Sequence, residues 1–209
     1  MPYNHNDPLE AQIRTSVASS LRNLSQREDS DADSYIDCLL LHSPLPTVEM
    51  TLDAWKILET YVPHKIRKLG ISNVNLAILE AIWENSTVKP SVVQNRFYPA
   101  TKYDVPLRRF CRRNNITYQS FWTLTGNPNL LKSKPVASLS AATGMSKSVA
   151  LYCLVVDLGV QVLNGTTSVA HMQEDLAGIA GVREWATVNQ KEWIQISHSF
   201  NGLVAPSLD

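Results

Sequence analysis

The chain has 209 residues, of which 44% are hydrophobic and 18% are charged, so it can bury one full core and needs no second domain. Its formal net charge is zero, which argues against a nucleic-acid or membrane-surface partner. No apolar run approaches the roughly 20 residues of a membrane span, and the first residues lack the basic and apolar segments of a signal peptide. We therefore expect a single cytoplasmic domain over residues 1–209.

The first predicted element is a helix within residues 1–34, followed by a polar and acidic loop at 26–33. Asp7, Pro8 and Glu10 provide a capping side chain, a proline at the first helical position and an acid three residues after the cap. Apolar residues then recur at helical spacing and form one face, at Leu9, Ile13, Val17, Leu21 and Leu24.

Strand and helix signals alternate through residues 35–181. Short apolar runs, as expected of parallel strands covered on both faces, predict strands at Ile36–Leu41, Ile66–Ile71, Ser91–Val93, Ile116–Phe121 and Val160–Leu163. Helices are predicted after Thr47, at Leu76–Ile82, around Leu107–Arg113 and from Ser146 to Val155, the last ending at Gly159. Residues 182–209 are predicted to form a helix and a tail packed on the outside.

Repeated strand–helix units without a hairpin signal indicate an α/β fold with a parallel sheet or barrel. About five strands are visible, whereas a closed barrel of this type uses eight.

The three cysteines, Cys38, Cys111 and Cys153, stand far apart and lack the paired spacing of a metal site. An odd number of cysteines inside apolar stretches favours reduced, buried thiols over disulfides. No metal site is predicted.

Polar side chains follow three of the predicted strands. His42 comes directly after Leu41, Ser72 and Asn73 come after Ile71, and Gln94 comes after Val93. The working residues of parallel barrels lie at these carboxyl ends of the strands.

The runs Tyr35–Pro44, Gly70–Asn73 and Val93–Pro99, taken in order, resemble three consecutive strand ends of the aldo-keto reductase family. The runs Val92–Pro99 and Tyr118–Trp122 look most like its fungal members. The resemblance implies a partial (β/α) TIM-like barrel that lacks the first three strands of the family barrel. Those strands carry the family's proton-donor Tyr, the Lys that acidifies it and the Asp that orients the Lys.

The resemblance also implies roles for the strand-end residues. His42 matches the His that orients or polarises the substrate carbonyl; the alternative is a His that bonds a loop carbonyl. Ser72, Asn73 and Gln94 match the set that binds the nicotinamide carboxamide, with which a hydroxyl and two amides are chemically complementary. A helix cap is the alternative for Ser72 and Asn73. Phe121 stands where the family places a ring against the nicotinamide, or else is a core aromatic.

The last predicted loop departs from the family pattern. Gly165 stands where the family commonly has a Lys, and His171 lies near the position of an Arg that grips a phosphate. Thr166, Thr167 and the following helix N-terminus could still hold a phosphate, or the loop is simply a tight turn. Because a His is a weaker anion partner than an Arg, we expect NAD(P)H to bind weakly or not at all.

Three functional hypotheses stay open. The first is binding of a small carbonyl or polyketide-like compound, with at most redox-neutral acid–base chemistry through His42. The second is an NAD(P)H-dependent carbonyl oxidoreductase with a substituted proton donor, and the third is a non-catalytic scaffold or truncated gene product. Because an incomplete barrel leaves strand edges unpaired, we also expect a homo-oligomer that covers them.

Overall fold

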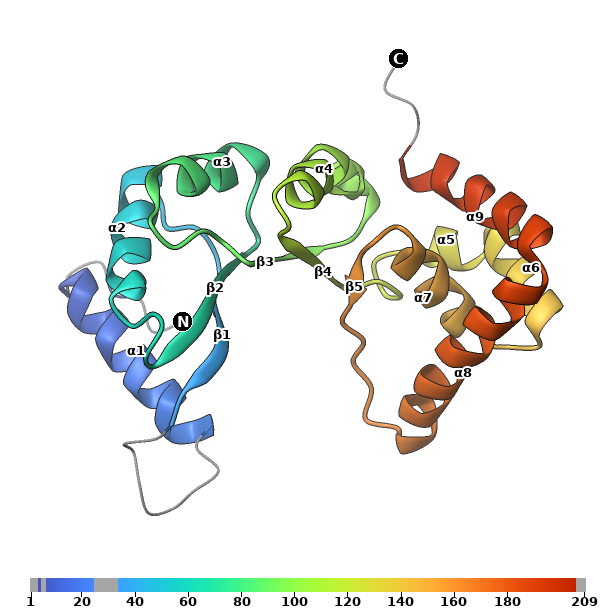
Figure 1. The fold of residues 1–209 in the computed structure, drawn as a ribbon, viewed down its shortest axis with the longest axis horizontal. Coiled ribbons are helices and arrows are strands. Elements are labelled where there is room, and N and C mark those ends of the chain that lie inside the picture. The colour runs from blue at the N-terminus through green and yellow to red at the C-terminus, as the bar shows by residue number, and fades with distance from the viewer. Residues whose placement is uncertain (1–3, 5–6, 25–33, 206–209) are drawn as a thin grey trace. The chain divides into compact units, whose positions relative to one another are not determined.

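The computed structural model describes residues 4, 7–24 and 34–205, which divide into two compact units (Figure 1). The first unit runs to Gln94 and includes residues 114–116, and the second comprises residues 95–113 and 117 onward. The prediction of a single domain stays a prediction. The predicted loop at 26–33 and the last residues of the predicted tail lie outside the described residues.

The first unit consists of alternating helices and parallel strands. Along the chain these are α1 (Leu9–Leu24), β1 (Ile36–Leu41), α2 (Val48–Glu59), β2 (Ile66–Ser72), α3 (Leu76–Asn85) and the start of β3 (Val92–Arg96). β1 and β2 pair in parallel from Ile36↔Ile66 to Leu41↔Ile71. β2 and β3 pair in parallel up to Ser72↔Gln94. This register brings the carboxyl ends of three strands to one edge.

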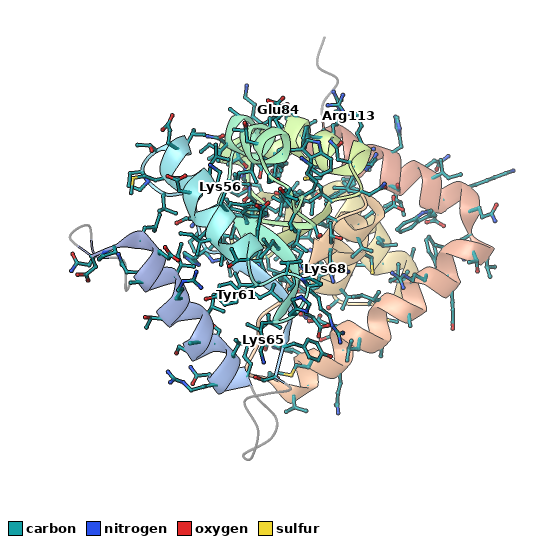
Figure 2. All side chains as sticks on the ribbon, turned by 60° about the vertical axis from the view of Figure 1, so that its left-hand side comes forward. Lys56, Tyr61, Lys65, Lys68, Glu84 and Arg113 are labelled. Carbon is teal, nitrogen blue, oxygen red and sulfur yellow. The ribbon has the colours of Figure 1, made fainter. Side chains whose placement is uncertain are left out.

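Local sequence explains the helices of this unit. Thr47 begins α2 because its side chain accepts a hydrogen bond from the Met50 amide at 3.2 Å, and Asn75 begins α3 in the same way. Trp55 is buried on α2, and its indole donates to the Val88 carbonyl at 2.9 Å. Charged side chains such as Lys56 and Glu84 stand on the outer surfaces of the helices (Figure 2). The apolar faces of α2 and α3 therefore pack inward.

The second unit is mainly helical. Its elements are the 3₁₀ segment η1 (Pro99–Asp104), α4 (Val105–Arg113), β4 (Thr117–Phe121), α5 (Pro128–Leu131), α6 (Lys134–Thr143), α7 (Lys147–Asp157), β5 (Gln161–Val162), α8 (Val169–Val188) and α9 (Gln190–Val204). β4 and β5 pair in parallel at Gln119↔Gln161. The predicted cap is confirmed, because the Ser146 hydroxyl accepts from the Val149 amide at the start of α7. Residues 149–155 of α7 are all buried.

The described part of the chain contains five strands in the order β1-β2-β3-β4-β5, which confirms the predicted α/β fold. The main differences from the predicted boundaries concern β3, β5 and α8. β3 continues through polar residues to Arg96, β5 has only two residues, and α8 already begins at Val169. The short helices between β4 and α7 were not predicted. Within the described residues, no single helix is long and apolar enough to cross a membrane, although α6 and α7, bent by 111°, reach the length as a pair.

Candidate functional site

The ends of β1, β2 and β3 are joined by a small hydrogen-bond network. The side-chain amide of Asn73 donates to the His42 carbonyl at 2.9 Å and to the Ser72 hydroxyl at 3.2 Å. The Ser72 hydroxyl donates to the Gln94 carbonyl at 2.6 Å, and the Asn73 backbone amide donates to the same carbonyl at 3.1 Å. The structure therefore brings together the four residues that the sequence placed at these strand ends.

The conformation of Asn73 makes this network possible. Its φ of 55° lies in the left-handed region, where asparagine is tolerated better than most residues. This turn directly after β2 aims the side chain back at the end of β1, while Ser72 stays buried. The Asn73 side chain thus works as a clamp between two neighbouring strands.

A cavity of about 200 Å³ lies beside His42 in the first unit. Its lining is mostly apolar and comes from α1, from the segment after β1 and from α2, namely Leu9, Gln12, Ile13, Ser16, Leu41, His42, Ser43, Pro44, Leu45, Pro46 and Ala54. His42 is the one lining residue of a type that titrates near neutral pH. The sequence alone did not show that α1 would form a wall beside His42.

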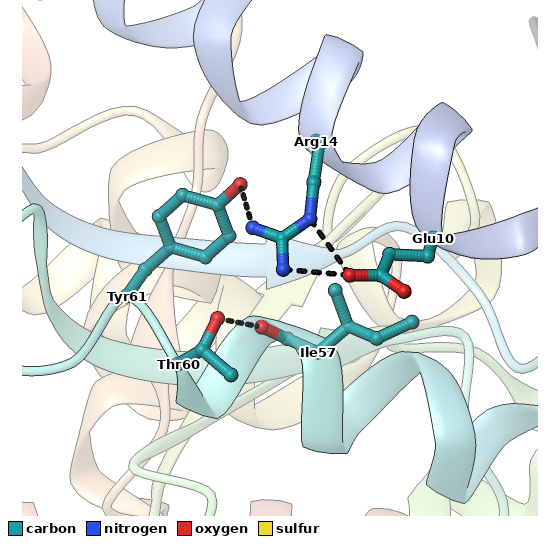
Figure 3. Close-up of polar contacts among 5 residues, drawn as sticks. All are labelled: Glu10, Arg14, Ile57, Thr60 and Tyr61. Atoms are coloured by element: carbon teal, nitrogen blue, oxygen red, sulfur yellow. Dashed lines mark hydrogen bonds and ion pairs between the residues drawn. The ribbon is translucent and has the colours of Figure 1, made fainter.

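The wall formed by α1 is tied to the end of α2 (Figure 3). The Arg14 guanidinium donates twice to the Glu10 carboxylate, at 2.6 and 2.9 Å, and reaches the Tyr61 hydroxyl at 3.5 Å. It also lies 5.9 Å from the centre of the Tyr61 ring. The hydrogen bond to Glu10 is the largest reason why the pKa of Arg14 is raised. The contacts to Glu10 orient Arg14 within α1, and the contact to Tyr61 links α1 to the segment directly after α2.

The remaining predicted residues belong to the second unit. Phe121 is half-buried and meets the Trp122 ring edge-on at 6.4 Å. Thr166 accepts a hydrogen bond from the Ser168 amide at 3.1 Å, and Thr167 is exposed. The Ser168 hydroxyl accepts from the His171 amide at 3.3 Å, so a side chain already caps the start of α8. A phosphate site at Thr166 and Thr167 stays a prediction.

Sequence reasoning identified Phe121 but missed Arg96 and Trp122 beside it. The guanidinium of Arg96 lies 3.8 Å from the centre of the Trp122 ring, and Tyr98 and Phe121 stand nearby. The sequence did contain a signal for Arg96. Residues two positions apart in a strand lie on the same face, so Arg96 could be expected on the same face as Gln94.

Asp104 is the centre of another polar cluster in the second unit, where it provides hydrogen-bond acceptors for two buried polar side chains. It accepts hydrogen bonds from the Asn95 amide at 2.8 Å and from the Tyr118 hydroxyl at 2.9 Å. Burial, and then the nearby Asp104 carboxylate, raises the pKa of Tyr118 well above its ordinary value. Tyr118 is therefore a protonated hydrogen-bond donor that satisfies a carboxylate, which is a structural role.

The described residues contain no group of three or more His, Cys, Asp or Glu side chains that could hold a metal ion. The three cysteines are free thiols, of which Cys111 and Cys153 are buried and Cys38 is partly exposed.

The strand-end network fits a nicotinamide carboxamide in part. Both hydrogens of the Asn73 amide nitrogen and the hydroxyl hydrogen of Ser72 are already engaged. Among the described residues, the Asn73 side-chain oxygen has no hydrogen-bond donor, so it can accept from the carboxamide NH₂ group. The network therefore offers this group an acceptor rather than a full set of partners.

Comparisons with known proteins identify the family of the chain. The Aldo/keto reductase family model matches residues 4–200. The NAD/NADP-dependent indole-3-acetaldehyde reductase of Schizosaccharomyces pombe is 28% identical over 174 residues, which cover 78% of this chain and 61% of that relative. The NADPH-dependent alpha-keto amide reductase of Saccharomyces cerevisiae is 32% identical over 93 residues, 42% of this chain and 30% of its own length. The chain thus spans less than two thirds of these relatives.

Solved structures show the same fold. An aldo-keto reductase from a Medee basin deep-sea metagenome library superposes with a TM-score of 0.70 at 19% identity, covering 87% of this chain and 68% of its own. The aldo/keto reductase of Brucella melitensis superposes with a TM-score of 0.66 at 21% identity. This match covers 80% of the present chain and 61% of the Brucella chain. These folds are TIM barrels, and the family model extends over nearly the whole chain. The chain belongs to the aldo/keto reductase family.

Proposed function

We propose that the chain binds a small carbonyl or polyketide-like compound in the cavity beside His42, and that His42 performs a redox-neutral acid–base step on it. The observation that carries the proposal is the position of His42 in a mostly apolar cavity whose lining contains no other ionisable side chain. In the proposed step, a ring nitrogen of the imidazole takes a proton from the carbon next to the carbonyl group and later returns it. No electrons are gained or lost.

The surroundings of His42 support this role. A mostly apolar wall limits water around the ligand, which strengthens hydrogen bonds made inside the cavity. The Asn73 amide holds the His42 carbonyl, so the backbone that carries the imidazole is fixed. General acid–base catalysis by a positioned side chain contributes about 10²- to 10⁴-fold to a rate.

The test is proton exchange at the carbon between the two carbonyl groups of pentane-2,4-dione, followed by NMR in deuterated water. We expect His42→Gln to lower the protein-catalysed rate by roughly a hundredfold with folding intact. The matched control is His64→Gln, because His64 is an exposed histidine of the same unit that does not line the cavity. An equal rate in His42→Gln and the unmodified protein would overturn the proposal.

The second candidate is NAD(P)H-dependent carbonyl reduction, which the names of the relatives favour. Asn73, with Ser72 and Gln94, would hold the nicotinamide carboxamide, and Thr166 and Thr167 would lie at a phosphate group. The cofactor would supply a hydride to the carbonyl carbon. We expect weak binding, because Gly165 leaves the loop after β5 without the family's cation. A sub-micromolar dissociation constant in a nicotinamide-fluorescence titration would place this candidate first.

A further inference from the structure

The end of β3 and the segment after β4 hold a cluster of one cation and three aromatic rings, Arg96, Tyr98, Phe121 and Trp122. The guanidinium carbon of Arg96 lies 3.8 Å from the centre of the Trp122 ring, 5.3 Å from that of Tyr98 and 5.8 Å from that of Phe121. All four residues belong to the second unit. A guanidinium over aromatic faces is attracted by the negative faces of the rings and stays charged.

The charge of Arg96 has no counter-charge in the described part of the chain. The ion pairs found there join Arg14 to Glu10, Lys56 to Asp53 and Arg67 to Asp37. The Nε atom of Arg96 is buried and has no hydrogen-bond acceptor among the described residues. The charge is therefore uncompensated within this part of the chain, and an anion that contacts the terminal guanidinium nitrogens would supply the missing counter-charge.

The Trp122 ring is held in place by an unusual backbone conformation. Its φ of 59° is rare for a bulky residue and persists only where the surroundings impose it. The Gly126 amide donates to the Trp122 carbonyl at 2.7 Å, and a Cβ atom at Gly126 would lie 2.8 Å from this carbonyl oxygen. The tight turn from Trp122 to Gly126 therefore requires the glycine.

Buried polar side chains fasten this turn to the segment after β3. The Asn127 amide donates to the carbonyls of Phe97 and Thr123, at 2.6 and 3.1 Å. The hydroxyls of Ser120 and Thr123 share a hydrogen bond of 2.9 Å. Arg96 and the ring of Trp122 are thus positioned before any ligand arrives, while 54% of Trp122 stays exposed.

We propose that this cluster is a binding site for a small aromatic carboxylate. The planar guanidinium fork matches the two oxygens of a carboxylate, and the exposed aromatic surface offers contact to a flat ring. Its residues come from the second unit, whereas those that line the cavity beside His42 come from the first, and its chemistry requires no acid–base group. Nothing in it depends on the function proposed above.

The test compares benzoate with benzamide, a neutral compound of similar shape, on the full chain. Binding is followed by NMR through the indole N–H signal of Trp122, which Trp122→Phe identifies among the five tryptophans. We expect benzoate to shift this signal saturably and benzamide to bind at least tenfold more weakly. Arg96→Gln should weaken benzoate binding tenfold or more. Arg109→Gln, an exposed arginine of α4, should leave it unchanged.

Three results would overturn the proposal. One is equal binding of benzoate and benzamide, and another is a folded Arg96→Gln variant with unchanged affinity for benzoate. The third is a Trp122 signal that inorganic pyrophosphate shifts and benzoate does not, which would indicate a site for phosphate groups instead. If Arg96→Gln does not fold, the comparison of benzoate with benzamide on the unmodified protein still tests whether the site prefers a carboxylate.

Discussion

The Asn73 side-chain amide donates a hydrogen bond to the backbone carbonyl of His42 at 2.9 Å and so joins the ends of two parallel strands. This contact links the residue that resembles a cofactor ligand to the residue that resembles a catalytic acid–base group. The side-chain amide nitrogen of Asn73 also donates a hydrogen bond to the Ser72 hydroxyl. Asn73 and His42 therefore stabilise the pairing of β1 with β2, and they also belong to the candidate site.

Replacement of Asn73 separates its two contributions to stability. Asn73→Gly removes the side-chain hydrogen bonds but keeps the φ of 55° accessible, so we expect a loss of about 1–2 kcal/mol in the free energy of unfolding. Asn73→Ala should lose about 1 kcal/mol more, because a Cβ atom disfavours this conformation. Urea unfolding measures both. Equal stability of the two variants would show that backbone strain plays no part.

Gly70 allows β2 to approach β3 closely. A Cβ atom at this position would lie 2.7 Å from the Val92 carbonyl oxygen and 3.3 Å from Cγ of Leu40. We expect Gly70→Ala to destabilise the protein by about 1–3 kcal/mol, since a rigid backbone atom must move. Thermal unfolding is the measurement.

Gly202→Ala is the matched control for Gly70→Ala. Gly202 lies in α9, where an added Cβ atom would meet nothing within 4 Å. Alanine is favoured over glycine in a helix by about 0.5–1 kcal/mol, so this variant should gain stability. Similar losses in both variants would contradict the steric explanation.

Buried thiols predict a loss of stability at alkaline pH. Burial raises the pKa of Cys111 from 9.0 to about 12 and that of Cys153 from 9.0 to about 11. Above pH 9 the unfolded chain releases these protons while the folded chain keeps them. The stabilisation is therefore complete below pH 9 and is lost as the pH rises towards 11 and 12, by up to about 1.4 kcal/mol per pH unit for each thiol.

The measurement is the urea midpoint of the unmodified protein and of Cys111→Ala between pH 8 and 10.5. The variant loses stability at every pH because it leaves a cavity, so the slope with pH is the quantity to compare. We expect a shallower decline in Cys111→Ala. If both proteins declined equally, the Cys111 thiol would not be linked to folding.

Sequence patterns predicted the strands and the residues at their ends. The spacing of apolar residues and the capping residues of helices can both be read from neighbouring positions in the chain. Thr47 and Ser146 cap helices as predicted. The end of β3 was missed because its last residues are polar, so the apolar run stops at Val93 before the strand does. The short helices α5 and α6 were missed although Pro128 and Pro135 stand in their first turns, where proline marks a helix start.

The two candidate sites depend on geometry that local patterns do not contain. The cavity beside His42 needs Ile13 of α1, almost 30 positions earlier in the chain, to lie against the end of β1. The contact between Arg96 and Trp122 needs a left-handed backbone at a bulky residue, which sequence preferences argue against. Both therefore required the tertiary structure.

Self-association over the unpaired strand edges stays a prediction, and α8 offers another candidate surface. Val169, Met172 and Leu176 recur at helical spacing on α8 and are 66%, 44% and 76% exposed. An exposed apolar stripe of this kind favours contact with another protein surface, and we propose a second copy of the chain. Size-exclusion chromatography with light scattering should show a mass above 23.3 kDa that falls on dilution.

The variant that tests this surface is Leu176→Glu, which places a charge on the most exposed residue of the stripe and should shift the protein towards the monomer. Ile194→Glu is its control, because Ile194 is 63% exposed on α9 and lies outside the stripe. Burying a carboxylate in an apolar contact is unfavourable, so association should weaken at Leu176 alone. A stable monomer at all concentrations of the unmodified protein would exclude self-association, and equal effects of the two variants would exclude this stripe as its surface.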